Sequence, residues 1–129
     1  MGQVLQAITS EEAPRALGPY SQAIVAGELV YCAGQIAVDP ATGQIGSGDI
    51  KEQTRRVLDN LAAVLRAAGS GLDRVTKTTV FLTDIAEFTA MNEVYAEKFG
   101  GHRPARSTIG VAALPRGSRI EVECIALRR

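Results

Sequence analysis

The last strand-like segment of the chain, Arg119 to Leu127, carries apolar side chains on both of its faces. Alternate side chains of a strand point to opposite sides of a sheet. One face holds Ile120, Val122, Cys124 and Ala126, and the other holds Glu121, Glu123, Ile125 and Leu127. A strand with apolar groups on both sides is typical of a sheet that is covered on both faces. The covering layers must come from the rest of the chain or from a second copy of it.

The segment from Val75 to Thr83 predicts a second strand of this kind. It is rich in Val, Thr and Phe, which favour strands. We expect Val80 and Leu82 on one face of this strand and Val75 and Phe81 on the other.

The longest periodic segment predicts an amphipathic helix of about five turns. Asp49 is its expected N-cap, and Gly69 is the expected residue just after its end. Its apolar face repeats at intervals of three and four residues and comprises Ile50, Thr54, Val57, Leu58, Leu61, Leu65 and Ala68. A second helix is predicted from about Ile85 to Phe99, with Phe88, Met91, Tyr95 and Phe99 on one stripe.

The order of elements predicts an α+β domain that spans residues 1–129. Further strands are expected at Val4–Ile8, Ser21–Ala26, Leu29–Ala33 and Ser107–Ala112. Right-handed crossovers would place both helices on one face of a single mixed sheet. The other face would then be apolar and uncovered, which predicts a homo-oligomer.

Composition narrows the classes of function. The chain has 129 residues, of which 46% are hydrophobic and 22% charged, and this balance is typical of one globular domain. Lys+Arg and Asp+Glu both number 14, so no global charge favours nucleic acid or an anionic membrane. No apolar run approaches the roughly 20 residues of a membrane span, and the first residues do not resemble a signal peptide. We therefore expect a cytoplasmic protein without a membrane or nucleic-acid partner.

Several common sites are not predicted. The single histidine, His102, rules out a His-rich metal cluster and is expected in a solvated loop. The glycine-rich segment 43–48 lacks the Lys-Ser/Thr ending of a phosphate-binding loop. Cys32 and Cys124 lie far apart in the sequence and are interpreted as small core residues in a reducing compartment. No metal or cofactor is expected.

Two charged residues are candidates for chemistry. Residues 103–129 hold six arginines and two glutamates, so this part of a neutral chain is basic. Arg106 stands at the mouth of a predicted strand behind Pro104, where a guanidinium can present its fork to a carboxylate. Glu121 lies on the apolar face that lacks a cover, where a carboxylate must be paired, hydrogen-bonded or holding water. From the residues alone, the two could form a ligand site or a structural salt bridge.

The chain resembles the RidA (YjgF) family of reactive-intermediate deaminases over nearly its whole length. The matching segments are Gly18–Ala23, Ala33–Ile36, Asp59–Leu61, Lys77–Leu82, Met91–Tyr95, Pro104–Ser107 and Ile120–Glu123. The Pro-Ala-Arg-Ser segment and the closing Ile-Glu-Val-Glu strand are its most specific parts. The resemblance implies a chorismate-mutase-like α+β fold that assembles as a homotrimer with clefts between subunits.

The same resemblance implies an activity and its residues. The family hydrolyses 2-imino acids and their enamine tautomers, such as 2-iminobutanoate and 2-iminopropanoate, to 2-keto acids and ammonia without a cofactor. Arg106 matches the residue that binds the substrate carboxylate, and Glu121 matches the acid that orients the attacking water. The implied substrate-binding positions are Tyr20, Ala33, Gly34, Asn92 and Thr108.

The chain departs from the family pattern at a few of these positions. Ala33 stands where many members have serine, and Thr108 stands where several have cysteine. The loop over residues 96–105 is shorter than in better-known members, which affects the expected substrate size. Two other functions are compatible with the same cleft: a non-catalytic small-molecule-binding regulatory trimer, and an endoribonuclease.

Overall fold

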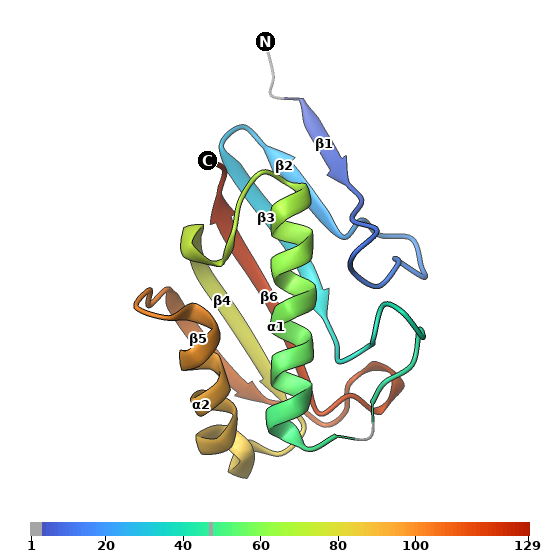
Figure 1. Ribbon diagram of the computed structural model, residues 1–129, viewed down its shortest axis with the longest axis vertical. Helices are drawn as coiled ribbons and strands as arrows, with labels where there is room; N and C mark the ends of the chain where they lie inside the picture. Colours follow the sequence, from blue (N-terminus) through green and yellow to red (C-terminus); the bar gives the residue numbers. More distant parts are fainter. Residues whose placement is uncertain (1–3, 47) are drawn as a thin grey trace.

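The computed structural model describes residues 4–46 and 48–129. These residues form one mixed sheet, with two α-helices packed on the same face of it (Figure 1). The strands are β1 (Leu5–Ile8), β2 (Ala23–Ala26), β3 (Leu29–Gln35), β4 (Val75–Leu82), β5 (Ala105–Gly110) and β6 (Ile120–Leu127). The helices are α1 (Ile50–Ala67) and α2 (Phe88–Phe99), and a short 3-10 turn, Ile85–Glu87, precedes α2. The predicted α+β architecture is confirmed, whereas expectations about the first three residues and Ser47 lie outside the described residues.

The last strand of the chain lies inside the sheet. The strand order is β1-β2-β3-β6-β4-β5, so β6 separates β3 from β4 and pairs antiparallel with both. β4 and β5 are parallel and are connected through α2. The helices cover only one face of β6, so the apolar residues on its other face, Ile125 and Leu127, have no covering layer among the described elements.

Helix α1 forms where the sequence predicts it. The Asp49 carboxylate accepts a hydrogen bond of 3.0 Å from the backbone N–H of Glu52, which satisfies one free donor of the first turn. The helix ends at Ala67, two residues before Gly69, whose φ of +77° suits glycine. The N–H of Ser70 donates to the carbonyl of Leu65. Its leucines at 58, 61 and 65 are fully buried against the sheet, where truncation of such a side chain to alanine costs about 2–5 kcal/mol.

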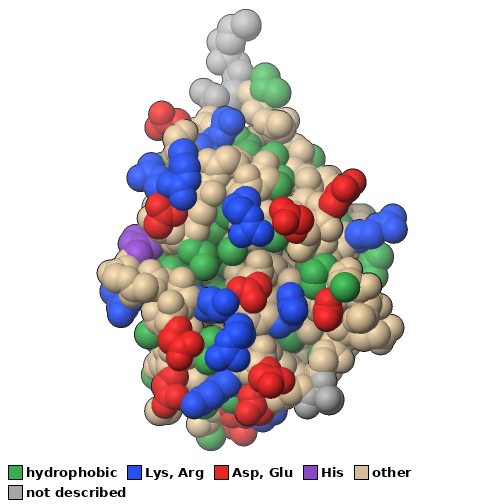
Figure 2. Space-filling model, viewed as in Figure 1, with side chains coloured by type: hydrophobic (Ala, Val, Ile, Leu, Met, Phe, Trp, Pro, Cys, Tyr) green, Lys and Arg blue, Asp and Glu red, His purple; other side chains and the backbone are tan. Residues whose placement is uncertain are grey.

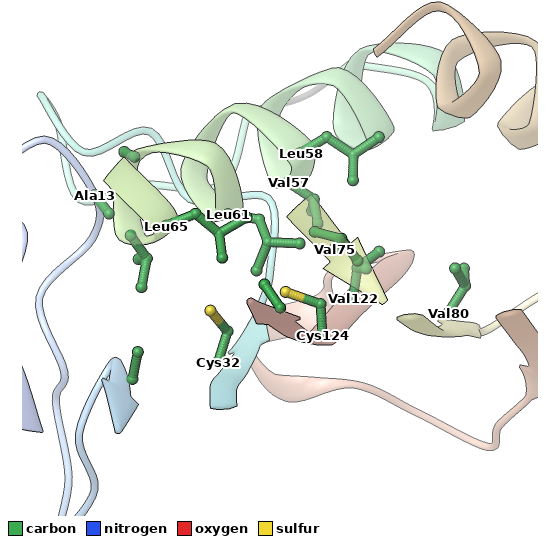
Figure 3. Packing of buried hydrophobic residues seen from close by; sticks show 14 of the residues in the cluster. Ala13, Cys32, Val57, Leu58, Leu61, Leu65, Val75, Val80, Val122 and Cys124 are labelled. Atoms are coloured by element: carbon green, nitrogen blue, oxygen red, sulfur yellow. The ribbon is translucent and has the colours of Figure 1, made fainter. Parts of the chain in front are cut away.

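Both cysteines lie in the core between α1 and the sheet (Figure 3). Cys32 on β3 is directly opposite Cys124 on β6, and both are free and buried. A hydrogen bond with Cys32, together with burial, holds the pKa of the Cys124 thiol far above its usual value. The prediction of small core residues is therefore confirmed, and neither thiol has the properties of a nucleophile.

One predicted face assignment in β4 is wrong. Val75 pairs with Ala126, whereas Lys77 pairs with Ile125, so Thr76 is an extra residue in the strand. This bulge turns Val75 to the core, where it is 1% exposed, on the same face as Val80 and Leu82. Strict alternation of side chains along the strand predicts Val75 on the same face as Phe81, because it does not include the bulge.

The two surfaces of the molecule differ in character. On the helical side, acidic and basic side chains alternate (Figure 2), and Lys51 pairs with Glu93 across α1 and α2 at 2.5 Å. On the other side of the sheet, no described element covers the strands. That open face carries apolar groups from several strands, among them Tyr31, Phe81, Ile109, Ile125 and Leu127.

Candidate functional site

Arg106 is the second residue of β5, and its side chain lies on the helical side of the sheet. Its register partner on β4 is Thr78, which is fully buried under α2. The Nη1 atom of Arg106 donates a hydrogen bond of 2.8 Å to Oδ1 of Asn92. The guanidinium carbon lies 4.7 Å from the ring centroid of Tyr95 and 5.4 Å from that of Phe88. The groups of helix α2 that lie next to the guanidinium of Arg106 are therefore uncharged.

No carboxylate among the described residues forms an ion pair with Arg106. A guanidinium has five N–H donors, and one of them is used by Asn92. A half-buried cation with free donors and neutral neighbours is suited to binding an anion, and its planar fork matches a carboxylate.

Glu121 lies on the opposite, open face of the sheet. It is a residue of β6 that alternates with the core residues Ile120 and Val122. Burial raises the pKa of its carboxyl above the usual value, and the charge of Glu123 raises it further. A carboxyl group with a raised pKa is better able to accept and return a proton near neutral pH.

Gly34 on β3 gives the Glu121 carboxyl its space. A Cβ atom at position 34 would lie 2.7 Å from Cδ of Glu121, closer than two such carbons approach. The residue before it, Ala33, adds no polar group. The absence of a side chain at Gly34 therefore keeps room for the carboxyl group of Glu121.

A pocket of about 580 Å³ opens beside Glu121 on this face. Tyr20, Ala33 and Gly34 line it, so the structure brings three of the predicted substrate-binding residues together with Glu121. Arg15 and Arg116 also line it, and neither was predicted from the sequence. Arg116 has a φ of 58° and donates a hydrogen bond of 2.8 Å to the carbonyl of Gly43, which ties two loops of the pocket together.

The remaining predicted residues, Asn92 and Thr108, lie with Arg106. Thr108 follows Arg106 by two residues on β5 and so faces the same side. Its Oγ1 atom is buried, and no described atom hydrogen-bonds to it. The predicted site residues thus form two groups on opposite faces of the sheet. The alternative of a structural salt bridge between Arg106 and Glu121 within one chain is therefore wrong.

His102 is not the solvated loop residue that the sequence predicts. Its ring is half-buried, and Nε2 lies 2.6 Å from the carbonyl oxygen of Val75 at the start of β4. This contact ties the loop after α2 to the sheet. No group of three or more His, Cys, Asp or Glu that could hold a metal occurs in residues 4–46 and 48–129.

The family model described as Endoribonuclease L-PSP matches residues 10–128. The chain belongs to this family, the YjgF/RidA family. A RutC family protein of Pyrococcus horikoshii is 53% identical over 95% of this chain and 98% of its own. The human 2-iminobutanoate/2-iminopropanoate deaminase is 44% identical over 97% of this chain and 91% of its own.

Solved structures of Rid family members have the same fold. A putative endoribonuclease of Thermotoga maritima superimposes with a TM-score of 0.93 at 49% identity, over 96% of this chain and 98% of its own. TdcF of E. coli with bound serine superimposes with a TM-score of 0.90 at 39% identity, over 96% of this chain and 99% of its own. No helix in the described part of this Rid family chain is long and apolar enough to span a membrane.

Proposed function

We propose that this chain is a hydrolytic deaminase of 2-imino acids and enamines such as 2-iminobutanoate and 2-iminopropanoate. Relatives from human, mouse and rat, 44–45% identical over 97% of this chain, are named for this reaction. The observation that carries the proposal is the half-buried Arg106 guanidinium, which has only uncharged partners among the described residues and is suited to a substrate carboxylate.

Glu121 performs the proton transfers in the proposed reaction. The oxygen of a water molecule bonds to the imine carbon while Glu121 carries one proton of that water to the nitrogen. The proton of the new hydroxyl group follows the same route as the C–N bond breaks. Ammonia leaves, and a carbon–oxygen double bond forms in the 2-keto acid product. A general base of this type contributes about 10²–10⁴-fold to a rate.

Arg106 and Glu121 act on one substrate only if they come from different copies of the chain. Inside one chain the sheet separates them, because Arg106 contacts α2 and Glu121 lies on the open face. The apolar open face provides a surface for a second copy. We propose a homotrimer whose clefts lie between subunits. Sedimentation should therefore give a species of three chains, and a 13.6 kDa species alone would contradict the trimer.

Each cleft then combines the two groups of residues. Tyr20, Ala33, Gly34 and Glu121 form one wall from the first copy. Arg106, which hydrogen-bonds to Asn92, and Thr108 form the other wall from the second copy. The predicted loop over residues 96–105 is shorter in the structure, because residues 96–99 belong to α2, and the remaining residues 100–104 border this wall. The absence of a side-chain hydroxyl at Ala33 makes the first wall less polar and favours substrates with apolar side chains.

The experiment couples a threonine dehydratase to the purified protein and follows the appearance of 2-oxobutanoate and ammonia. The proposal predicts faster appearance of both products than in a matched reaction without the protein. Equal rates in the two reactions would contradict a deaminase.

A non-catalytic ligand-binding trimer is the second candidate, and the serine bound to E. coli TdcF is the observation that favours it. In that case the protein would bind 2-oxobutanoate or serine in calorimetry but would leave the coupled reaction unchanged. The endoribonuclease named in the family description is checked with the same preparation on single-stranded RNA.

A further inference from the structure

Three residues of α2 contact the Arg106 side chain. Phe88, Asn92 and Tyr95 follow one another at intervals of four and three residues, so they lie on one stripe of the helix. Asn92 accepts a hydrogen bond from Nη1 of Arg106, and the rings of Phe88 and Tyr95 lie within 5.4 Å of its guanidinium carbon. We call this set of three residues the arginine cradle.

The Tyr95 part of the cradle is fixed. Tyr95 is 6% exposed, and its hydroxyl lies 2.7 Å from Oγ1 of Thr78, the register partner of Arg106 on β4. The ring of Phe99 packs 4.6 Å from the Tyr95 ring on the side of the next helical turn. The Tyr95 ring is therefore held against both the sheet and the helix, and it cannot turn away from the guanidinium without breaking these contacts.

The cradle differs from the three ion pairs that link α2 to basic side chains of other elements. Lys51, Arg55 and Arg119 form ion pairs with Glu93, Glu97 and Glu87, which are carboxylates of α2 or of the residue before it. Arg106 meets an amide and two rings instead. Carboxylates next to an arginine would occupy its fork, whereas ring faces and one amide oxygen orient the fork and leave its charge for a ligand.

We infer that the arginine cradle is a neutral positioning device that sets the affinity of Arg106 for the substrate carboxylate. Phe88, Asn92 and Tyr95 act through Arg106 and are positioning residues. The inference deepens the proposed deaminase function and rests on it.

Replacing Asn92 with Asp tests the neutrality of the cradle. Asp has nearly the same shape as Asn but adds a carboxylate that competes with the substrate for the same guanidinium. We expect Asn92→Asp to raise KM at least about tenfold and to change kcat much less. The reason is that Arg106 would donate its charged hydrogen bonds to the new carboxylate on α2 and no longer to the substrate carboxylate. Calorimetry with 2-oxobutanoate should show the same loss of affinity.

The control is Thr89→Asp, which adds the same charge at an exposed position of α2 away from the stripe. If both variants raise KM equally, added charge on the helix explains the effect and the cradle is rejected. An Asn92→Asp variant with wild-type KM would also overturn the inference.

Removing a ring tests the positioning role. Phe88 is 37% exposed, so Phe88→Leu keeps the fold while removing one ring from the guanidinium. We expect KM to rise several-fold, about 2–5-fold for one exposed cation–π contact. Tyr95→Phe keeps the ring and should retain most affinity, whereas Tyr95→Leu should not. Equal KM values for Tyr95→Phe and Tyr95→Leu would contradict a role for the ring.

A measurement without substrate separates the cradle from the deaminase proposal. The chemical shift of the Arg106 side-chain N–H is measured by NMR, and its signal is identified by its loss in Arg106→Lys. The ring currents of Phe88 and Tyr95 should move this chemical shift away from the usual arginine value. In Phe88→Leu it should move back toward that value. If the wild-type protein neither hydrolyses imines nor binds 2-oxobutanoate, the proposed function fails, while this signal still reports on the cradle. An Arg106 signal that is unchanged in Phe88→Leu would overturn the inference.

Discussion

The two faces of the sheet hold two differently built halves of the candidate site. Arg106, on the helical face, is fixed by contacts with three side chains of α2. Glu121, on the open face, lies in a pocket beside Gly34, and no described side chain hydrogen-bonds to its carboxyl group. A group that binds charge benefits from being held in place. A group that transfers protons must change its charge state, and a carboxyl fixed by strong donors would be locked in one state.

Changing Arg106 should have the largest effect. Arg106→Ala removes the fork and should abolish nearly all imine hydrolysis, with carboxylate binding weakened at least about tenfold. Arg106→Lys keeps a charge but loses the planar pair of donors, so it should retain the oligomer and lose most activity. The coupled dehydratase assay measures both. A substrate analogue without a carboxylate is the control, since Arg106→Ala and the wild type should differ little on it.

Glu121→Gln should have the next largest effect. It keeps the shape of the side chain but can neither accept nor return a proton, so we expect turnover to fall roughly 10²-fold or more. Binding of 2-oxobutanoate, measured by calorimetry, should change much less. Near-normal turnover would assign Glu121 a structural role. The half of the site on the open face would then contain no group assigned to proton transfer.

Gly34→Ala should displace the Glu121 carboxyl group without unfolding the protein. The new methyl group would collide with a flexible side chain, so the carboxyl moves and the strand stays. A small displacement of a catalytic group lowers kcat, here by about tenfold. Gly46→Ala is the matched control, because no atom lies within 4 Å of a Cβ at that position. Equal kcat values for the two variants would show that the carboxyl position is not critical.

The smallest expected effect is on the pH profile. Glu121 must be ionised to accept a proton, so kcat/KM should rise with pH through its raised pKa. Glu123→Gln removes one of the two causes of that raised pKa. The pKa of Glu121 should then fall, and the acid limb of the profile should shift to lower pH. A shift to higher pH would contradict this account of the electrostatics.

The fold was predictable from local patterns because its elements follow local rules. The N-cap Asp49, the heptad-like leucines of α1 and the glycine after it identify that helix without any knowledge of its neighbours. The boundaries of β5 were less predictable. The sequence suggests Ser107–Ala112, whereas the strand is Ala105–Gly110 because its parallel pairing with β4 begins at Lys77 and Ala105.

The candidate site was predictable as a set of residues but not as a geometry. The family resemblance identifies Arg106 and Glu121, yet the side of the sheet that each one faces depends on the register between β4 and its two neighbours. Register is a long-range property, and one bulge at Thr76 is enough to invert a face assignment. The stripe predicted on the second helix comprised Phe88, Met91, Tyr95 and Phe99 and did not include Asn92. The contact of Phe88, Asn92 and Tyr95 with Arg106 was not predictable, because it depends on the placement of β5 beside α2.

The shared site requires that Arg106 and Glu121 come from different copies of the chain. Subunit exchange tests this claim directly: inactive Arg106→Ala and inactive Glu121→Gln are mixed in equal amounts, dissociated and reassembled. Random reassembly puts an intact arginine and an intact glutamate in about a quarter of the clefts of a closed ring, so the account predicts recovery of about a quarter of the wild-type activity. If both residues act within one chain, the mixture stays as inactive as its two components, and that result would contradict the shared site.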